Sequence, residues 1–378
     1  MESTIGKQFE LYSGNTPSRL NKDYFKGEIN WISSGELKDH YIYSSKEKIS
    51  QEASLNLKLL PAGTFIIAIY GLEAEGVRGT GSIIKEQSTI SQACMAFSSI
   101  GEVENEFLYS WYKKHGNIIG LKYAQGTKQQ NLSYDILERF KIAYPSKQEQ
   151  EKLYNFISLL DERIATQNKI IDDLKKLMSA ISKQVFAQKP NEWNRLDTLF
   201  SKGKAGGTPT STNKEYYNGE IPFLSINDIT KQGKYVQYTE NHLSQSGLEN
   251  SSAWVVPKYS LIMSMYASVG LVTINEIPIT TSQAMFAMQL KDKDLLDYLY
   301  YYLSYFKYRH IHKYLETGTQ SNINAEIVRG IMIPTYGHSR NMEISSTLQG
   351  IDVKIANELS VLRLFNRQKN YLLSQMFI

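Results

Sequence analysis

Residues 153–185 read LYNFISLLDERIATQNKIIDDLKKLMSAISKQV, and their apolar side chains recur at gaps that alternate between four and three residues. An apolar period of 3.5 residues is typical of the seam by which one long helix packs against another in a coiled coil. The seam positions are Leu153, Ile157, Leu160, Ile164, Gln167, Ile171, Leu174, Met178, Ile181 and Val185. The stretch therefore predicts a helix of about 50 Å that needs a helical partner.

A second seam of the same kind lies near the end of the sequence. Each of its positions is a position of the first seam shifted by 191, as from Leu153 to Ile344. The positions are Ile344, Leu348, Ile351, Ile355, Glu358, Leu362, Phe365, Lys369, Leu372 and Met376. Two helices separated by a whole domain can return past each other in opposite directions. We therefore expect an antiparallel coiled coil with one globular unit at each end, related by a pseudo-two-fold axis.

The segments that precede the two predicted helices also repeat each other. Residues 14–30 read GNTPSRLNKDYFKGEIN and residues 206–222 read GGTPTSTNKEYYNGEIP. Apolar runs at 64–67 and 260–263 predict buried strands, and aromatic segments around 107–109 and 298–300 predict helices. Between them the tripeptide Ser-Gln-Ala occurs at 91–93 and again at 282–284. The sequence therefore contains one unit written twice.

The expected fold class is α+β, with two pseudo-repeated globular domains separated by two long helices that form an antiparallel coiled coil. The expected boundaries are 1–146 for the first globular domain, 147–189 for the central helix, 190–336 for the second globular domain and 337–378 for the C-terminal helix. A break at Lys189-Pro190 ends the central helix, because proline cannot continue it.

The composition is that of a folded soluble protein without a disulfide framework. The 378 residues allow about two domains. A single cysteine, Cys94, fits a reducing, cytoplasmic compartment, and its apolar surroundings favour a buried thiol over a nucleophile. The first ten residues lack the apolar core of a signal peptide, and no apolar run is long enough to span a membrane. A net charge of +4 permits nucleic-acid binding, provided that the basic footprint is local.

Motifs for catalysis are missing from the sequence. It contains no Gly-rich dinucleotide motif, no phosphate-binding Walker loop, no methyltransferase tetrapeptide and no nuclease cluster. The histidines His115, His310, His312 and His338 show no metal-ligand spacing. We therefore predict a chain that is not an enzyme, with no catalytic residue, no metal site and no cofactor of its own.

Polar loops are the candidate recognition elements. Residues 126–131 combine amide, hydroxyl and ammonium groups on a Gly-led loop, and such side chains can grip phosphates or base edges. The alternative is that Asn131 and Asn322 cap the element that follows, and both interpretations stay open. Arg78 and Lys85, like Lys231 and Lys234, fall on predicted loops. The tyrosines around Tyr298–Tyr308 favour core packing over base stacking.

The arrangement as a whole resembles the specificity (S) subunit of type I restriction–modification systems. The resemblance rests on the Gly-Asn-Thr-Pro and Gly-Gly-Thr-Pro motifs, the two Ser-Gln-Ala tripeptides, the two Gly-Thr loops and Gln148-Glu149-Gln150 at the start of the central helix. The sequence departs from the family pattern at residues 338–341, where His-Ser-Arg-Asn stands at the start of the second helix, so docking there is in doubt.

The resemblance implies a non-catalytic reader of double-stranded DNA, in which each of two target-recognition domains reads half of a bipartite site and the coiled coil sets the spacing. It also implies methylation (M) subunits that dock on the coiled coil and bind S-adenosylmethionine, and a restriction (R) motor subunit. The residues nominated for DNA binding are Arg19, Lys22, Tyr70, Arg78, Gln92, Lys122, Thr127, Lys128, Gln129, Asn131, Lys214, Lys231, Lys234, Tyr266, Gln283, Thr319, Gln320 and Asn322. Alternatives are a self-contained restriction enzyme or its half, the recognition subunit of a related type II (IIG/IIB-like) enzyme, and a purely structural coiled-coil protein. The missing methyltransferase and nuclease motifs disfavour the first of these.

Overall fold

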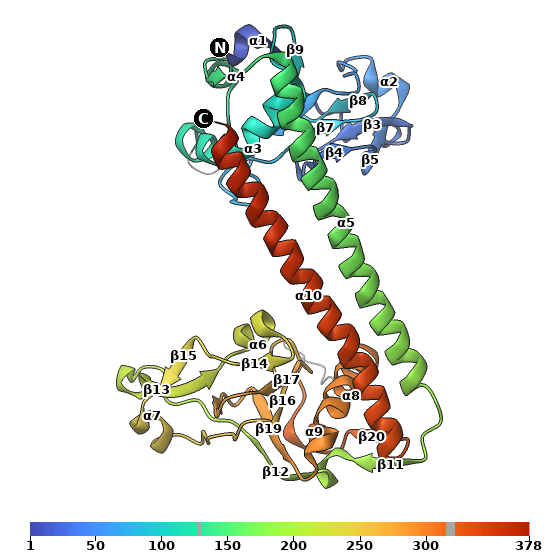
Figure 1. Ribbon diagram of the computed structural model, residues 1–378, viewed down its shortest axis with the longest axis vertical. Coiled ribbons are helices and arrows are strands. Elements are labelled where there is room, and N and C mark those ends of the chain that lie inside the picture. The colour runs from blue at the N-terminus through green and yellow to red at the C-terminus, as the bar shows by residue number, and fades with distance from the viewer. Residues whose placement is uncertain (127–129, 315–321, 378) are drawn as a thin grey trace. The chain divides into compact units, whose positions relative to one another are not determined.

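The computed structural model describes residues 1–126, 130–314 and 322–377. The chain divides into two compact units, the first formed by Met1–Lys169 with Leu359–Ile378 and the second by Ile170–Glu358. Each unit contains one globular domain and part of both long helices, α5 and α10, which stand out as the longest ribbons in Figure 1. The boundaries expected for the globular domains stay predictions, because the units divide within the helices.

The two seams form the predicted helices, α5 at Lys147–Phe186 and α10 at His338–Met376. Every seam position is buried or half-buried, whereas most positions between them are exposed. In the first unit Ile157 of α5 shares a core with Leu373 of α10, and in the second unit Phe186 of α5 shares a core with Ile344 of α10. The start of one helix thus packs with the end of the other, so the antiparallel arrangement is confirmed.

The described residues of the first unit form three sheets and, besides the long helices, the four α-helices α1 to α4. A two-stranded sheet pairs β1 with β10, a five-stranded sheet has the order β2-β9-β6-β7-β4, and a three-stranded sheet has the order β5-β3-β8. The strands are β1 Glu2–Thr4, β2 Phe9–Ser13, β3 Ile29–Ile32, β4 Tyr41–Ile42, β5 Glu47–Ile49, β6 Phe65–Ala68, β7 Gly81–Ile84, β8 Ser88–Ile90, β9 Cys94–Ser99 and β10 Lys141–Ala143. The helices are α1 Ile5–Gln8, α2 Gln51–Ser54, α3 Asn105–Tyr123 and α4 Tyr134–Glu138.

The second unit repeats this topology. Its sheets have the orders β11-β20, β12-β19-β16-β17-β14 and β15-β13-β18. The strands are β11 Glu192–Arg195, β12 Phe200–Ala205, β13 Tyr217–Leu224, β14 Tyr235–Val236, β15 Asn241–Leu243, β16 Leu261–Ser264, β17 Val272–Asn275, β18 Thr280–Thr281, β19 Met285–Leu290 and β20 Met332–Thr335. The helices are α6 Ile226–Gln232, α7 Gln245–Glu249, α8 Leu296–Arg309 and α9 Ala325–Arg329.

The strand register shows that the repeat in the sequence is also a repeat in the structure. Phe65 of β6 lies opposite Ile83 and Phe97, and Leu261 of β16 lies opposite Ile274 and Met288 in the same way. The predicted apolar strands and the two aromatic helices, α3 and α8, are therefore confirmed.

Aromatic side chains of α3 and α8 fill the core beside each five-stranded sheet. Tyr109 on α3 and Tyr298 on α8 are among the largest fully buried side chains. Tyr301 and Tyr302 are also buried, which confirms core packing for most of the tyrosine cluster. Tyr308 is the exception and is 78% exposed.

The start of α5 is tied to the globular domain by one buried amide. Gln150 is fully buried; its Oε1 accepts from the Glu104 N–H at 3.0 Å, and its Nε2 donates to the carbonyl oxygens of Glu102 and Pro145. At the equivalent position on α10, Asn341 is also buried, but its amide bonds to Tyr336 and Thr335. The departure at residues 338–341 thus changes a structural contact of the helix start.

We expect Gln150→Leu to lower the free energy of unfolding of the first unit by about 1–3 kcal/mol. The substitution leaves the partly buried Glu104 N–H without its acceptor, and the cost of this unpaired group exceeds the gain from added apolar surface. Chemical denaturation measures the change, with Gln148→Leu on the exposed side of the same turn as the control. Equal stability of the two variants would contradict this role for Gln150.

Candidate nucleic-acid interface

In the first unit, three motifs that are far apart in the sequence meet at one end of the five-stranded sheet. The Ile69 N–H donates to the Ala93 carbonyl at 2.9 Å, and the Leu132 N–H donates to the Ile69 carbonyl at 2.9 Å. Asn131 forms bridges with Tyr70 and with Gln125. The fold therefore brings together three nominated residues, Tyr70, Gln92 and Asn131.

The second unit builds the same junction from the repeated motifs. The Met265 N–H donates to the Ala284 carbonyl at 2.7 Å, and the Ile323 N–H donates to the Met265 carbonyl at 3.1 Å. These bonds place the neighbours of Tyr266, Gln283 and Asn322 side by side. Tyr266 is 42% exposed and Gln283 is exposed, so both side chains are accessible to a ligand.

The Gly-Asn-Thr-Pro and Gly-Gly-Thr-Pro motifs begin at Gly14 and Gly206, which contact the Ser-Gln-Ala turns. Gly14 donates to the Cys94 carbonyl and Gly206 to the Met285 carbonyl, at 3.2 and 3.0 Å. A Cβ atom on Gly14 would lie 2.3 Å from the Ile90 and Ser91 carbonyl oxygens, so glycine is required by this close approach. The turn beneath it presents Gln92 to solvent, as the equivalent turn presents Gln283.

A cleft of about 500 Å³ opens at the junction of the first unit, and Tyr70, Gln125, Asn131 and Tyr134 contribute to its lining. The Oδ1 atom of Asn131 is buried and has no hydrogen-bond partner among the described residues. Ser133 occupies the N-cap position of α4, which begins at Tyr134, and Asn324 caps α9 by accepting from the Ile327 N–H. The alternative that Asn131 and Asn322 are the helix caps is therefore wrong. Sequence reasoning missed Tyr134, which is 44% exposed.

Two nominated arginines of the first unit are held by protein groups. Arg19 forms a bidentate ion pair with Glu47 at 2.6 and 2.8 Å, and this contact holds the pKa of the Glu47 carboxyl below its usual range. Arg78 donates to the carbonyl oxygens of Leu72 and Glu73 and to Asn117. Arg78 thus orders the loop between β6 and β7. The nominated Lys22, Lys122 and Lys214 are exposed.

Two nominated lysines of the second unit differ from expectation. Lys231 lies on helix α6 and pairs with Glu240, so its placement on a loop was wrong. Lys234 does precede a strand, but its side chain is 9% exposed and lies 2.7 Å from Asp297. Because this ammonium group is already paired in the interior, we leave Lys234 out of the proposed interface. Five other nominated residues, Thr127, Lys128, Gln129, Thr319 and Gln320, lie outside the described residues.

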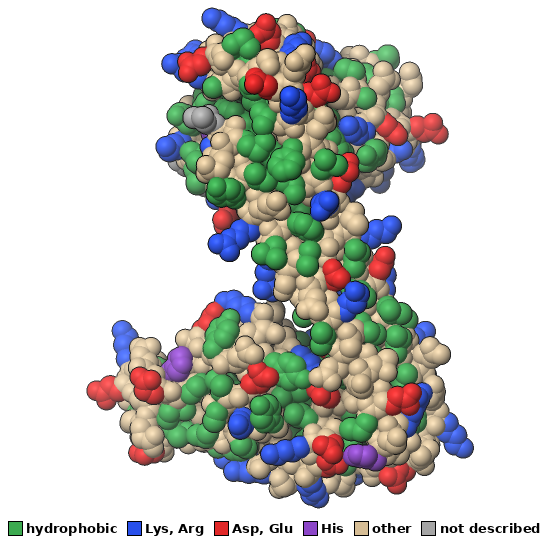
Figure 2. Space-filling model, viewed as in Figure 1, with side chains coloured by type: hydrophobic (Ala, Val, Ile, Leu, Met, Phe, Trp, Pro, Cys, Tyr) green, Lys and Arg blue, Asp and Glu red, His purple; other side chains and the backbone are tan. Residues whose placement is uncertain are grey.

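The cysteine, the candidate metal ligands and the charged surface complete the description of the chain's polar chemistry. Cys94 is buried, as predicted, and burial raises the pKa of its thiol to about 12. The described part of the chain has no group of three or more His, Cys, Asp or Glu side chains placed to hold a metal ion. In Figure 2, Lys and Arg side chains are interspersed with Asp and Glu on the visible face, so positive charge there is confined to small groups of side chains.

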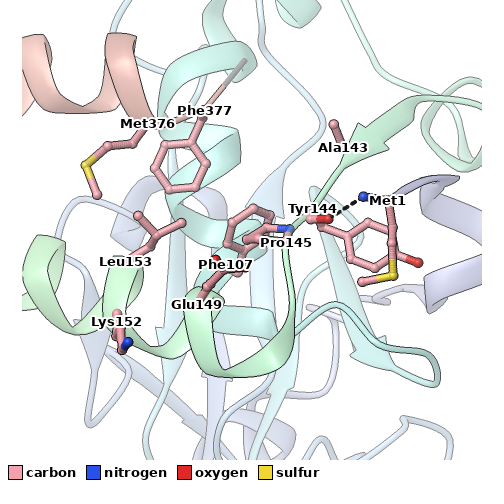
Figure 3. Close-up of a pocket in the computed structure, with 10 residues that line it drawn as sticks. All are labelled: Met1, Phe107, Ala143, Tyr144, Pro145, Glu149, Lys152, Leu153, Met376 and Phe377. Atoms are coloured by element: carbon pink, nitrogen blue, oxygen red, sulfur yellow. Dashed lines mark hydrogen bonds between the residues drawn. The ribbon is translucent and has the colours of Figure 1, made fainter.

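Another pocket, of about 530 Å³, lies at the start of α5 in the first unit. Figure 3 shows Phe107, Leu153, Met376 and Phe377 converging on it, with the Met1 amino group donating to the Tyr144 carbonyl. Its lining is mainly apolar, with Glu149 and Lys152 as its charged side chains. No helix among the described residues is long and apolar enough to cross a membrane.

Comparison with known proteins decides the family. The profile of the type I restriction modification DNA specificity domain matches residues 1–176 and again residues 190–360. The chain belongs to this family. The two matches correspond to the two copies of the repeated unit.

Curated relatives are specificity subunits. The type I restriction enzyme MjaIX specificity subunit of Methanocaldococcus jannaschii is 28% identical over 249 residues, which cover 59% of this chain and 56% of that protein. The HindI specificity subunit of Haemophilus influenzae is 33% identical over 113 residues, or 29% of this chain and 24% of that protein. The chain thus spans about half, or less, of the length of these relatives.

Solved structures confirm the fold class. The S subunit of a type I restriction–modification system from M. genitalium aligns over 100% of this chain and 96% of its own, with 15% identity and a TM-score of 0.64. A chain from a structure that describes complex assembly and conformational transition of the type I system aligns over 99% of this chain and 96% of its own, with 17% identity and a TM-score of 0.59. At these identities the likeness establishes two α+β domains with long helices.

Proposed function

We propose that this chain is the sequence-specific DNA-recognition subunit of a type I restriction–modification complex. The observation that carries the proposal is the junction built twice, with Tyr70, Gln92 and Asn131 in one unit and Tyr266, Gln283 and Asn322 in the other. Each junction presents amide and phenol groups, which can bond to base edges and stack on bases. Two similar sites with different residues around them suit an asymmetric DNA site in two halves.

The chain itself supplies recognition, and we propose that the chemistry belongs to its partners. Methylation subunits would hold S-adenosylmethionine, and a motor-nuclease subunit would complete the complex in the cytoplasm. Exposed apolar side chains on the long helices support docking of a helical partner, with Leu159 58% and Leu177 48% exposed on α5, and Leu364 63% exposed on α10. The curated relatives favour the type I system over a type II recognition subunit.

Selection of bound sites from random DNA tests the proposal. The full chain, with a methylation subunit, is expected to enrich two short specific half-sites separated by a nonspecific spacer of fixed length. The chain alone is expected to transfer no methyl group from S-adenosylmethionine to the selected DNA. Enrichment of a single continuous site, or methyl transfer by the purified chain alone, would contradict the proposal.

A further inference from the structure

A buried polar cluster joins the sheet of the first unit to helix α5. The His40 side chain, which directly precedes β4, is 5% exposed and lies between the rings of Tyr41 and Tyr109, with centroids 4.0 and 3.9 Å away. Its Nε2 atom lies 2.9 Å from Glu106 Oε2 on α3, and its Nδ1 atom lies 3.2 Å from Asp161 Oδ2 on α5. A protonated imidazole can donate from both nitrogens, whereas a neutral imidazole donates from one.

The two carboxylate contacts of His40 are unequal. The Glu106 contact is an aligned hydrogen bond, whereas neither His40 Nδ1 nor Asp161 Oδ2 completes one at 3.2 Å. A neutral ring would therefore keep its proton toward Glu106 and lose its attraction to Asp161. That loss removes the ionic contact between His40 and α5. The Glu106 contact remains, as does the hydrogen bond at 3.1 Å between the Tyr41 hydroxyl of β4 and the Ser158 hydroxyl of α5.

Other charges around the cluster do not replace this link. Lys369 of α10 pairs with Asp161, so it joins helix to helix, and Lys85 lies 3.7 Å from Glu106 within the domain. Burial raises the pKa of Asp161, but contacts with His40 and Lys369 outweigh it and leave that pKa lowered. Burial lowers the pKa of Lys113 to about 8, and repulsion from Lys369 adds to this effect. Attraction by Asp161 and Asp39 opposes it only in part.

The second unit has carboxylates at the equivalent positions but a lysine in place of the histidine. Asp297 and Asp352 stand 191 positions after Glu106 and Asp161. Lys234 takes the place of His40, since its carbonyl oxygen accepts from Ile274 as that of His40 accepts from Ile83, both at 2.8 Å.

Tyr301 carries the connection to α10 in the second unit. Its hydroxyl accepts from Lys234 Nζ at 2.9 Å and donates to Asp352 at 2.7 Å. Burial raises the pKa of Asp352, and the rings of Tyr235 and Tyr300 lie beside the Lys234 ammonium group. Lysine keeps its charge across the neutral pH range, where histidine changes its own.

We propose that His40 is a positioning residue that makes the attachment of the first recognition domain to α5 depend on pH, whereas Lys234 makes the equivalent attachment in the second unit independent of pH. This inference rests on the proposed function. β4 is the edge strand of the sheet, and β6 and β9 of the same sheet adjoin Tyr70 and Gln92. Loss of the proton from His40 therefore loosens the domain that reads the first half-site.

The test measures half-site discrimination by the full chain at several pH values. Discrimination is the ratio of affinities for the selected DNA and for DNA with one half-site altered. As the pH rises through the neutral range, discrimination at the first half-site is expected to fall about three- to tenfold, which is the loss of one ionic contact weaker than a full hydrogen bond. Discrimination at the second half-site is expected to stay constant. His40→Lys is expected to abolish the fall, and Lys234→His to create one at the second half-site.

Controls separate the contact between His40 and Asp161 from general effects of pH. His338→Lys, at an exposed histidine, should leave the fall in discrimination at the first half-site unchanged. Lys113→Met should also leave this fall in place, which would exclude Lys113 as its source. Amide hydrogen exchange without DNA, corrected for intrinsic rates, should show that β4 opens more at high pH in the wild type than in His40→Lys.

The outcomes also separate this inference from the proposed function. An equal fall at both half-sites, a fall that persists in His40→Lys, or one abolished by Lys113→Met would overturn the role of His40. So would exchange at β4 that does not depend on His40. Absence of sequence-specific binding in every variant would instead overturn the proposed function, and with it this inference.

Discussion

Ile157→Asp is expected to unfold the first unit or to lower its free energy of unfolding by at least about 4 kcal/mol. Ile157 is fully buried where the seam of α5 joins the core of the globular domain. The substitution removes apolar burial and places a carboxylate in the interior without a cation. It also sets two acidic residues four positions apart on one helix face, because Asp161 follows one turn later.

The matched control for this prediction lies two residues along the same helix. Leu159 is 58% exposed, so Leu159→Asp is expected to change the stability by less than about 1 kcal/mol. Thermal and chemical unfolding of the full chain measure both variants. Similar destabilisation by the two substitutions would show that the seam positions do not carry the packing of α5.

Gly14→Val is expected to cost about 3 kcal/mol or more and to impair reading of the first half-site. The added side chain would collide with the backbone oxygens of Ile90 and Ser91, and backbone atoms cannot move aside as a flexible side chain can. Relief of the collision shifts the segment that lies on the Ser-Gln-Ala turn, and Gln92 with it. The second half-site should keep its reading, because Gly206 makes the equivalent contact there.

Gly76→Val provides the control for the first unit. A Cβ atom on Gly76 meets nothing within 4 Å, and the residue lies on the loop between β6 and β7. Stability and half-site discrimination should both stay near wild type. If Gly14→Val behaved like Gly76→Val, the Gly-Asn-Thr-Pro motif would have no role in holding the turn.

The architecture could be predicted because its signals are periodic or repeated. A 3.5-residue apolar period requires a helical partner, so the seams of α5 and α10 were predictable position by position. The shared offset of the motifs likewise predicted one fold built twice. The same offset relates Glu106 to Asp297 and Asp161 to Asp352, so the sequence also contains a signal for the paired carboxylates.

The site was harder to predict because burial of a charge depends on tertiary packing. Lys234 looks like an exposed loop lysine in the sequence, yet Asp297 and Tyr301 from a distant helix enclose it. Asn131 looks like a helix cap, yet the helix begins after Ser133. Local sequence reports propensity, whereas these outcomes depend on partners 60 or more residues away, as the separation of 67 between Lys234 and Tyr301 illustrates.

The measurement that tests the central claim most directly is an exchange of one globular domain. Residues 190–336 are replaced by the corresponding domain of a specificity subunit with a different target, and bound sites are selected from random DNA with the methylation subunit present. If each unit reads its own half-site, the second half-site changes to that of the donor while the first half-site and the spacer length stay the same. A change in both half-sites, or in neither, would contradict the account.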